Sequence, residues 1–192
     1  MEKGRLEAFT DGVIAVIITI MVLEMKAPHS PTWEALRELW PVLLSYILSF
    51  VYVGIYWNNH HHMLHATERV NGRAMWANLH LLFWVSLFPF VTAWMSENHF
   101  AAVPTALYGA VLLMAAIAWP ILLRELIACN GGEQCPLARA VGRDVKGKLS
   151  IFLYASAIPL AFVNPWISCA LYVAVAAIWF IPDRRIEKVE AA

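Results

Sequence analysis

Six long stretches of this chain are apolar on nearly every side, and polar positions do not alternate with apolar ones inside them. The stretches cover residues 6–25, 36–58, 75–95, 102–124, 148–163 and 164–182. Each approaches the ~20 residues that a helix needs to cross a bilayer. The strands of a membrane barrel would alternate apolar and polar side chains. The pattern therefore predicts an all-α, polytopic membrane protein whose six transmembrane helices form a single domain over residues 1–192.

Turn-forming residues mark the joins between these stretches. Proline and serine at residues 28–31 break the first join, Asn71 and Gly72 the second, and Asn130 opens the longest. Four prolines instead lie inside predicted spans, where neighbouring helices can satisfy the carbonyl groups that proline leaves free. They are Pro41, Pro89, Pro120 and Pro159.

Composition and charge support a membrane protein and exclude other classes. Apolar residues make up 60% of the chain and charged residues 15%, and the formal net charge is zero. An ordinary soluble domain has roughly a quarter of its residues charged. Intrinsic disorder requires low hydrophobicity and high net charge, so it is excluded. Nucleic-acid binding is disfavoured because no excess of basic residues is available to neutralise phosphates.

The basic residues are distributed unevenly over the predicted joins. If the chain crosses the membrane six times, twelve of its fourteen Lys and Arg residues lie on one side, and only Lys26 and Arg37 lie on the other. Loops rich in Lys and Arg stay in the cytoplasm. We therefore predict a multi-pass protein of the cell membrane, surrounded by lipid, with both termini cytoplasmic. The twelve residues are Lys3, Arg5, Arg69, Arg73, Arg124, Arg139, Arg143, Lys146, Lys148, Arg184, Arg185 and Lys188.

The first stretch carries a carboxylate and a hydroxyl in otherwise apolar surroundings. Asp11 stands at its head, and Thr19 is the next polar side chain before Glu24. At helical spacing Val16, Thr19 and Leu23 share one stripe, with Ile20 beside it. In an oligomer this stripe could line a pore, with apolar rings as gates and a ring of hydroxyls facing the ion. Alternatively, the helix is buried in lipid and protein, and Thr19 bonds to the carbonyl one turn earlier.

Several motifs resemble those of the transmembrane protein 175 potassium channels. Arg5 followed by FTDGV at residues 9–13 is similar to the first-helix signature of that family, with Thr10 where serine is usual. WNNHH at residues 57–61 and LLFWVSLFPF at residues 81–90 are also similar to the family. The resemblance extends to the length and order of all six stretches.

The resemblance implies a homotetrameric channel with the first helix lining the pore. By this resemblance Val16 forms the first constriction, Thr19 the layer that prefers potassium, and Ile20 and Leu23 further apolar pore positions. It implies a moderately potassium-selective channel, a possible secondary proton leak, and no cofactor besides the permeant potassium ions. The residues that brace the pore helix by the same resemblance are Arg5, Phe9, Thr10 and Asp11, together with His60 or His61.

Four histidines at the end of the second stretch allow other functions. His61 and His65 are four residues apart and share a helix face, as do pairs of metal ligands. Two further ligands would be needed, and none is evident nearby, so we expect no metal site. The alternatives that would use residues 60–65 are a membrane-embedded metal-dependent enzyme and a cation-coupled transporter. A transporter usually has ionisable groups at the bilayer midplane and inverted repeats, which the sequence does not show.

Overall fold

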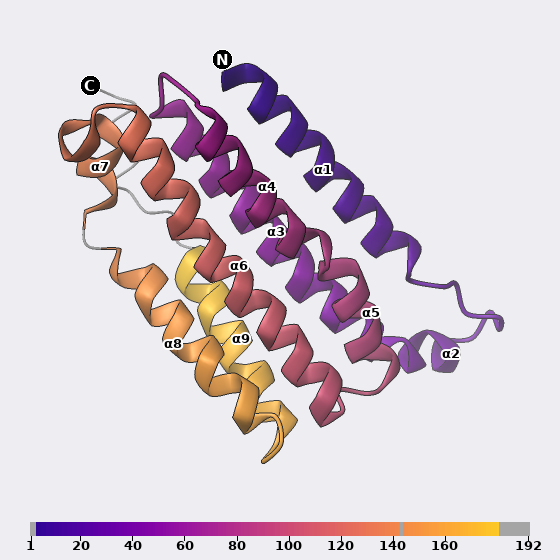
Figure 1. The fold of residues 1–192 in the computed structure, drawn as a ribbon. Coiled ribbons are helices and arrows are strands. Elements are labelled where there is room, and N and C mark those ends of the chain that lie inside the picture. Colours follow the sequence, from indigo (N-terminus) through magenta and orange to yellow (C-terminus); the bar gives the residue numbers. More distant parts are fainter. Residues whose placement is uncertain (1–2, 143, 181–192) are drawn as a thin grey trace.

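The chain folds into a bundle of long helices that lie side by side (Figure 1). The computed structural model describes residues 3–142 and 144–180, and helices are the only regular elements within those ranges. In chain order the elements are α1 (Lys3–Leu23), α2 (Trp33–Glu38), α3 (Trp40–His65), α4 (Gly72–Ser86), α5 (Phe88–Glu97), α6 (Ala102–Cys129), the 3₁₀ turn η1 (Gly132–Gln134), α7 (Pro136–Val141), α8 (Val145–Leu160) and α9 (Pro165–Phe180).

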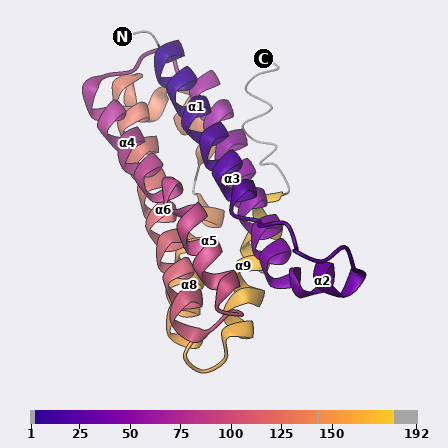
Figure 2. The same cartoon turned by 90° about the vertical axis from the view of Figure 1, so that its right-hand side faces the viewer.

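Helix α6 holds the bundle together, because it packs against α4 and α5 on one side and α8 and α9 on the other. Helix α1 lies at the edge of the bundle, and its partners are α3, α4 and α5 (Figures 1 and 2). This all-α architecture agrees with the predicted fold class. One face of α1 is therefore left without a partner in the subunit.

Four segments within the described residues are long and apolar enough to cross a membrane. They are α1, α3, the α4–α5 pair over Gly72–Glu97, and α6. Helices α8 and α9 have 16 residues each, which corresponds to about 24 Å at 1.5 Å per residue, against a hydrocarbon core of about 30 Å. Six crossings therefore stay a prediction. Residues 181 and 182, at the end of the sixth predicted stretch, lie outside the described part.

Two of the prolines expected inside spans also lie in the first turn of a helix. The predicted second stretch starts at residue 36, but the structure has the short α2 there, and the long helix α3 begins at Trp40 with Pro41 in its first turn. The predicted third stretch is interrupted at Leu87, and Pro89 lies in the first turn of α5. Proline suits a first turn because its missing N–H would have no intrahelical partner there. The predicted start of the second stretch was therefore wrong. Pro41 and Pro89 nevertheless lie inside the candidate spans Trp40–His65 and Gly72–Glu97, and Pro120 and Pro159 lie inside α6 and α8.

Helix α6 continues past residue 124, where the sequence predicts a loop. Arg124 and Glu125 belong to its penultimate turns, and it ends at Cys129. The side chain of the next residue, Asn130, forms hydrogen bonds that join the α3–α4 loop to this helix end. Its side-chain Oδ1 accepts from the backbone N–H groups of Glu68 and Arg69, at 3.0 and 2.8 Å, and its Nδ2 donates to the carbonyl of Arg69 at 2.9 Å.

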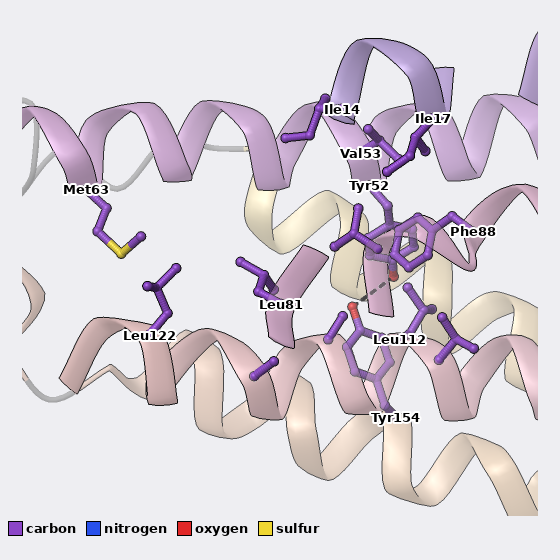
Figure 3. Close-up of a cluster of buried hydrophobic side chains, with 14 of the residues drawn as sticks. Ile14, Ile17, Tyr52, Val53, Met63, Leu81, Phe88, Leu112, Leu122 and Tyr154 are labelled. Carbon is purple, nitrogen blue, oxygen red and sulfur yellow. Dashed lines mark hydrogen bonds between the residues drawn. The ribbon is translucent and has the colours of Figure 1, made fainter. Parts of the chain in front are cut away.

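The core combines aliphatic side chains with tyrosines whose hydroxyl groups are paired (Figure 3). The Tyr154 hydroxyl donates to that of Tyr52 at 3.1 Å, and the Tyr52 hydroxyl donates to the carbonyl oxygen of Tyr172 at 2.6 Å. The Tyr172 hydroxyl in turn donates to the carbonyl oxygen of Thr105 at 3.0 Å. Tyr172 reaches α6 over Gly109, where a Cβ atom would collide with its hydroxyl group.

Candidate functional site

The first helix has one face turned to its own subunit and one face turned away. The buried face repeats every three or four residues, as a helix packed on one side requires. Figure 3 shows Ile14 and Ile17 of this face beside Val53 of α3. The buried residues are Leu6, Thr10, Ile14, Ile17 and Met21.

The four residues expected to line a pore are all on the opposite face. Val16 is 55% exposed, Ile20 41% and Leu23 77%, and Thr19 is exposed too. Within residues 3–142 and 144–180 no helix covers this apolar face, so it is free to meet lipid or another protein surface. The structure of one subunit does not distinguish these environments, and the pore assignment stays a prediction.

The Thr19 hydroxyl is engaged within its own helix. It donates to the carbonyl oxygen of Val16 at 2.8 Å, the bond expected if the helix is simply buried. A hydroxyl has one hydrogen to donate and two lone pairs to accept with. The bond therefore uses the hydrogen and leaves the lone pairs of the Thr19 oxygen turned outward. A cation is coordinated by lone pairs, so this arrangement is compatible with both alternatives.

A buried chain of hydrogen bonds holds α1 against α3 and α4. The Asn78 side chain, which is fully buried in α4, donates from Nδ2 to the Thr10 hydroxyl at 2.8 Å. Because its Nδ2 is the donor, its Oδ1 must accept, and His60 Nε2 lies 2.9 Å from it. Thr10 and His60 are also buried. Unpaired polar groups in this position would be costly, so the chain fixes how the three helices fit together.

Charged groups surround this buried chain at the same end of α1. The Asp11 carboxylate accepts from the indole Nε1 of Trp57 at 2.9 Å. The Glu7 carboxylate lies 3.3 Å from Nδ1 of His61. Lys3 Nζ donates to the carbonyl oxygen of Thr67 at 3.0 Å, just after the end of α3. Each contact joins α1 to α3 or to the residues that follow it.

Two of the residues expected to brace the pore helix make no hydrogen bond or ion pair to α3 or α4 among the described residues. Arg5 and Phe9 are both exposed. Within residues 3–142 and 144–180, the Arg5 guanidinium has no ion pair or hydrogen bond, and Asp11 pairs with Trp57 rather than with Arg5. Any bracing role of these two side chains must therefore involve groups outside the described subunit.

The histidine cluster is not assembled as a metal centre. Among the described residues no three His, Cys, Asp or Glu side chains are grouped as metal ligands. The rings of His61 and His65 are 5.7 Å apart between centroids, as their spacing predicts. The cluster is divided, because His60 is buried against Asn78 whereas His61 faces Glu7.

The sequence did not identify which side chains contact the bracing residues Thr10, Asp11, His60 and His61. Trp57 and Asn78 received no role there, although Trp57 belongs to a motif that carries the family resemblance. An asparagine in the middle of an apolar stretch is itself a signal, because a buried amide needs hydrogen-bond partners. Its partner depends on how α1, α3 and α4 are aligned, which spacing along one helix does not reveal.

Comparison with known proteins shows that this chain is similar to channels. Residues 5–89, which include most of α1, the brace and the start of α5, match the family described as endosomal/lysosomal potassium channel TMEM175. A potassium channel of Chryseobacterium sp. (strain P1-3) is 52% identical over 188 residues, covering 98% of this chain and 97% of that protein. A potassium channel of Streptomyces collinus is 33% identical over 183 residues, covering 89% and 88% of the two chains.

A solved structure has the same fold. It is the crystal structure of a lysosomal potassium-selective channel TMEM175 homologue from Chamaesiphon minutus, and it superposes with a TM-score of 0.81. The sequence identity is 28%, and the match covers 94% of this chain and 97% of that chain. The likeness therefore includes α8 and α9, beyond the segment that the family match covers.

Proposed function

This chain belongs to the TMEM175 family of channels, and we propose on that premise that it forms a cation channel with a moderate preference for potassium. The relatives and the matched structure are channels rather than enzymes, so the metal-dependent enzyme considered for residues 60–65 is discarded. The chain is a membrane protein. That potassium is the permeant ion, that α1 lines the pore and that identical subunits assemble around it are parts of this proposal.

The observation that carries the proposal is the uncovered face of α1. Val16, Thr19, Ile20 and Leu23 form one continuous stripe that no helix of the subunit covers. A stripe facing only lipid has no need of a hydroxyl, whereas a pore wall gains from one. Four copies of α1 around a symmetry axis would enclose a narrow passage with this stripe on its inside.

The apolar residues of the stripe would gate the passage. Rings of branched side chains at Val16, Ile20 and Leu23 leave too little room for a hydrated ion when they are close together. Such constrictions close a channel by excluding water and open it when they widen. Valine is the smallest of the three, so the ring at residue 16 is the easiest of them to wet.

Thr19 would supply the preference for potassium. Its hydroxyl hydrogen is bonded to the Val16 carbonyl, so four oxygens would point their lone pairs into the passage at one level. An ion that has shed water there regains oxygen ligands from the ring. The preference would be moderate because one ring of hydroxyls replaces only part of a hydration shell.

The brace would hold the pore helix in place without contacting the ion. Thr10 and Asp11 bond to Asn78 and Trp57, on the face of α1 that is turned to its own subunit or at its edge. His60 and His61 act from α3, through Asn78 and Glu7. Arg5 and Phe9, which are exposed, would complete the brace by contacts with a neighbouring subunit.

The assembly that fits this function is a homotetramer of single-domain subunits, with residues 1–192 crossing the membrane six times. Its place is the cell membrane, with both termini cytoplasmic, as the distribution of basic residues indicates. The partners are identical subunits, lipid and potassium ions, and no cofactor is required.

The test is electrical. The purified protein is reconstituted into a planar bilayer with potassium on one side and sodium on the other, and the reversal potential gives the selectivity. We expect unitary currents and a reversal potential shifted toward that of potassium. Slow flux that requires a second coupled ion would instead favour the transporter alternative.

Thr19→Val separates the role of the hydroxyl from that of pore width. Valine has nearly the shape of threonine but no oxygen, so we expect a lower potassium-to-sodium permeability ratio with conductance largely retained. Ile18→Val is the matched control, because Ile18 is half-buried against the core. If Thr19→Val keeps the wild-type ratio while Ile18→Val loses it, the pore face has been assigned to the wrong side of α1.

The secondary proton leak expected by resemblance to the animal members of the family is measured in liposomes that contain the purified protein. A pH gradient across the liposomes, without potassium, reports protons alone through an enclosed pH dye. Dye response in wild-type liposomes above that of protein-free liposomes is the expected result.

A further inference from the structure

The subunit contains a pocket that is separate from the pore face of α1. It is a cavity of about 380 Å³ between α3, α6, α8 and α9, and no residue of α1 lines it. This volume is within the range of small-molecule sites, about 300–1,000 Å³. None of the residues assigned to the pore or its brace contributes to it.

The inner wall of the cavity is mainly aromatic and apolar, and several of its polar atoms are paired within the subunit. Tyr52 and Tyr154 line it with their rings while their hydroxyl groups bond to each other. Trp179 donates from its indole Nε1 to the Ser150 hydroxyl at 2.8 Å. Asn59 donates to the carbonyl of Ile55 at 2.8 Å. A wall made mainly of aromatic rings and aliphatic side chains favours an apolar guest over water.

The outer side of the cavity is cationic. Arg124 of α6 and Lys148 of α8 line it and are exposed. Neither side chain has an ion pair or hydrogen bond within the described ranges. The carboxylate in the lining, Asp144, is occupied as the cap of α8, where it accepts from the N–H of Gly147 at 3.0 Å. Two unpaired cations therefore stand at the edge of an apolar hollow.

The length of α6 places these cations at headgroup depth. Its 28 residues extend about 42 Å, longer than the hydrocarbon core of about 30 Å. Arg124 lies about 33 Å along the helix from Ala102, just past one core thickness. Basic pockets between transmembrane helices at this level are typical sites for anionic lipid headgroups.

We propose that this cavity binds an anionic phospholipid of the bilayer, with its phosphate between Arg124 and Lys148 and one acyl chain along the aromatic wall. The guanidinium fork of arginine matches the oxygen geometry of a phosphate, and lysine adds a second positive charge. A free phosphate would leave the apolar volume empty, and a neutral amphiphile would leave both cations unpaired.

The test is photo-crosslinking of the whole purified protein in neutral detergent. The probe is phosphatidylglycerol that carries a diazirine on one acyl chain, and the labelled peptides are mapped by mass spectrometry. We expect labels on the α6 and α8 segments that line the cavity. Unlabelled phosphatidylglycerol should displace the probe, while phosphatidylcholine and inorganic phosphate at equal concentration should not.

Charge variants test the headgroup contact. R124Q and K148Q should each lower probe labelling in the cavity about fivefold, the effect expected for one basic residue near an anionic surface. R139Q is the matched control, since Arg139 is exposed on α7 but does not line the cavity. I151W fills the hollow while keeping both cations, and it should abolish labelling there with the elution volume of the protein unchanged.

Three results would overturn the proposal. Equal displacement by phosphatidylcholine would indicate ordinary boundary lipid, and displacement by inorganic phosphate would indicate a simple anion site. Cavity labelling that persists in both R124Q and K148Q would remove the cations from the site. None of these readouts depends on conductance, so the lipid site and the proposed channel are tested separately.

Discussion

At the scale of single residues, the direction of each hydrogen bond in the brace is fixed. Asn78 donates to Thr10 through its nitrogen, so its oxygen accepts from His60. His60 must therefore carry a hydrogen on Nε2, and Asn78 uses both its donor and its acceptor in these two bonds. The brace thus depends on side-chain chemistry as well as on shape.

Asn78→Asp tests this dependence with almost no change in volume. Aspartate replaces the N–H donor that faces Thr10 by an acceptor, and its ionised carboxylate is buried in a fully enclosed position, which costs stability even if the Thr10 hydroxyl turns to donate to it. We expect the variant to be less stable by about 1–3 kcal/mol. The measurement is the midpoint of thermal unfolding in detergent.

Variants at Thr10 provide the control. Thr10→Ser keeps the hydroxyl and should stay close to wild type, whereas Thr10→Val loses it and should be destabilised like Asn78→Asp. An Asn78→Asp protein that unfolds at the wild-type temperature would show that the buried chain contributes nothing to stability.

At the scale of elements, close packing between α6 and α9 depends on the absence of one side chain. Tyr172 of α9 reaches the Thr105 carbonyl over Gly109. Gly109→Ala should push the tyrosine away and break that bond, at a cost of about 1–3 kcal/mol, the usual range for overpacking. The unfolding midpoint should fall accordingly.

A matched glycine makes this prediction specific. Gly54 lies inside α3, and a Cβ atom added there would meet no neighbouring side chain or helix within 4 Å. Gly54→Ala should therefore be neutral or stabilising by up to about 1 kcal/mol. Adding Tyr172→Phe to Gly109→Ala removes the colliding hydroxyl and should recover part of the loss. Equal effects of the two alanines would argue against the contact.

Helix boundaries show what the apolar pattern can predict and where it fails. The first predicted stretch, residues 6–25, agrees with α1 to within three residues at each end. A segment that crosses lipid must be both apolar and helical, so the two patterns coincide there. Pro41 and Pro89 do lie inside candidate spans, but the pattern did not show that each of them begins a helix. Helix α6 extends beyond Arg124 because a helix does not end where its surroundings become polar.

The candidate site was predictable along α1 and not across the bundle. The 3.6-residue repeat separates Ile14 and Ile17, which are buried, from Val16 and Thr19, which are exposed. The Asn78 and Trp57 partners depend on the relative height of neighbouring helices, which side-chain packing sets. The resemblance to a known family supplied roles for Thr10 and Asp11 but not these contacts.

At the scale of the whole molecule, the number of membrane crossings follows from where three surface positions lie. In a background with Cys129, Cys135 and Cys169 replaced by alanine, single cysteines at Glu97, Val163 and Arg139 can be labelled in intact cells with an impermeant maleimide. All three positions are exposed. The distribution of basic residues predicts labelling from outside at Glu97 and Val163, and at Arg139 only after the cells are opened.

Val163 decides whether α8 and α9 cross, because it lies in the turn that joins them. If these 16-residue helices dip into the membrane and return, a cysteine there will stay unlabelled from outside while the one at Glu97 reacts. Labelling at Arg139 without opening the cells would reverse the proposed orientation altogether. Arg143 and the basic residues beyond residue 180 lie outside the described part.

The hydrogen bonds between Asn130 and the α3–α4 loop have a consequence for folding during synthesis on the ribosome. The loop at Glu68 and Arg69 obtains its partners from a residue 61 positions further along the chain than Arg69. At about 5–20 residues per second, a ribosome needs about 3–12 s to add that length. Throughout that interval the α3–α4 loop can be held by Lys3, which donates to the carbonyl of Thr67, but the backbone N–H groups of Glu68 and Arg69 lack their Asn130 partner. Asn130 is the first residue synthesised after α6, so these hydrogen bonds can form only once α6 has been made.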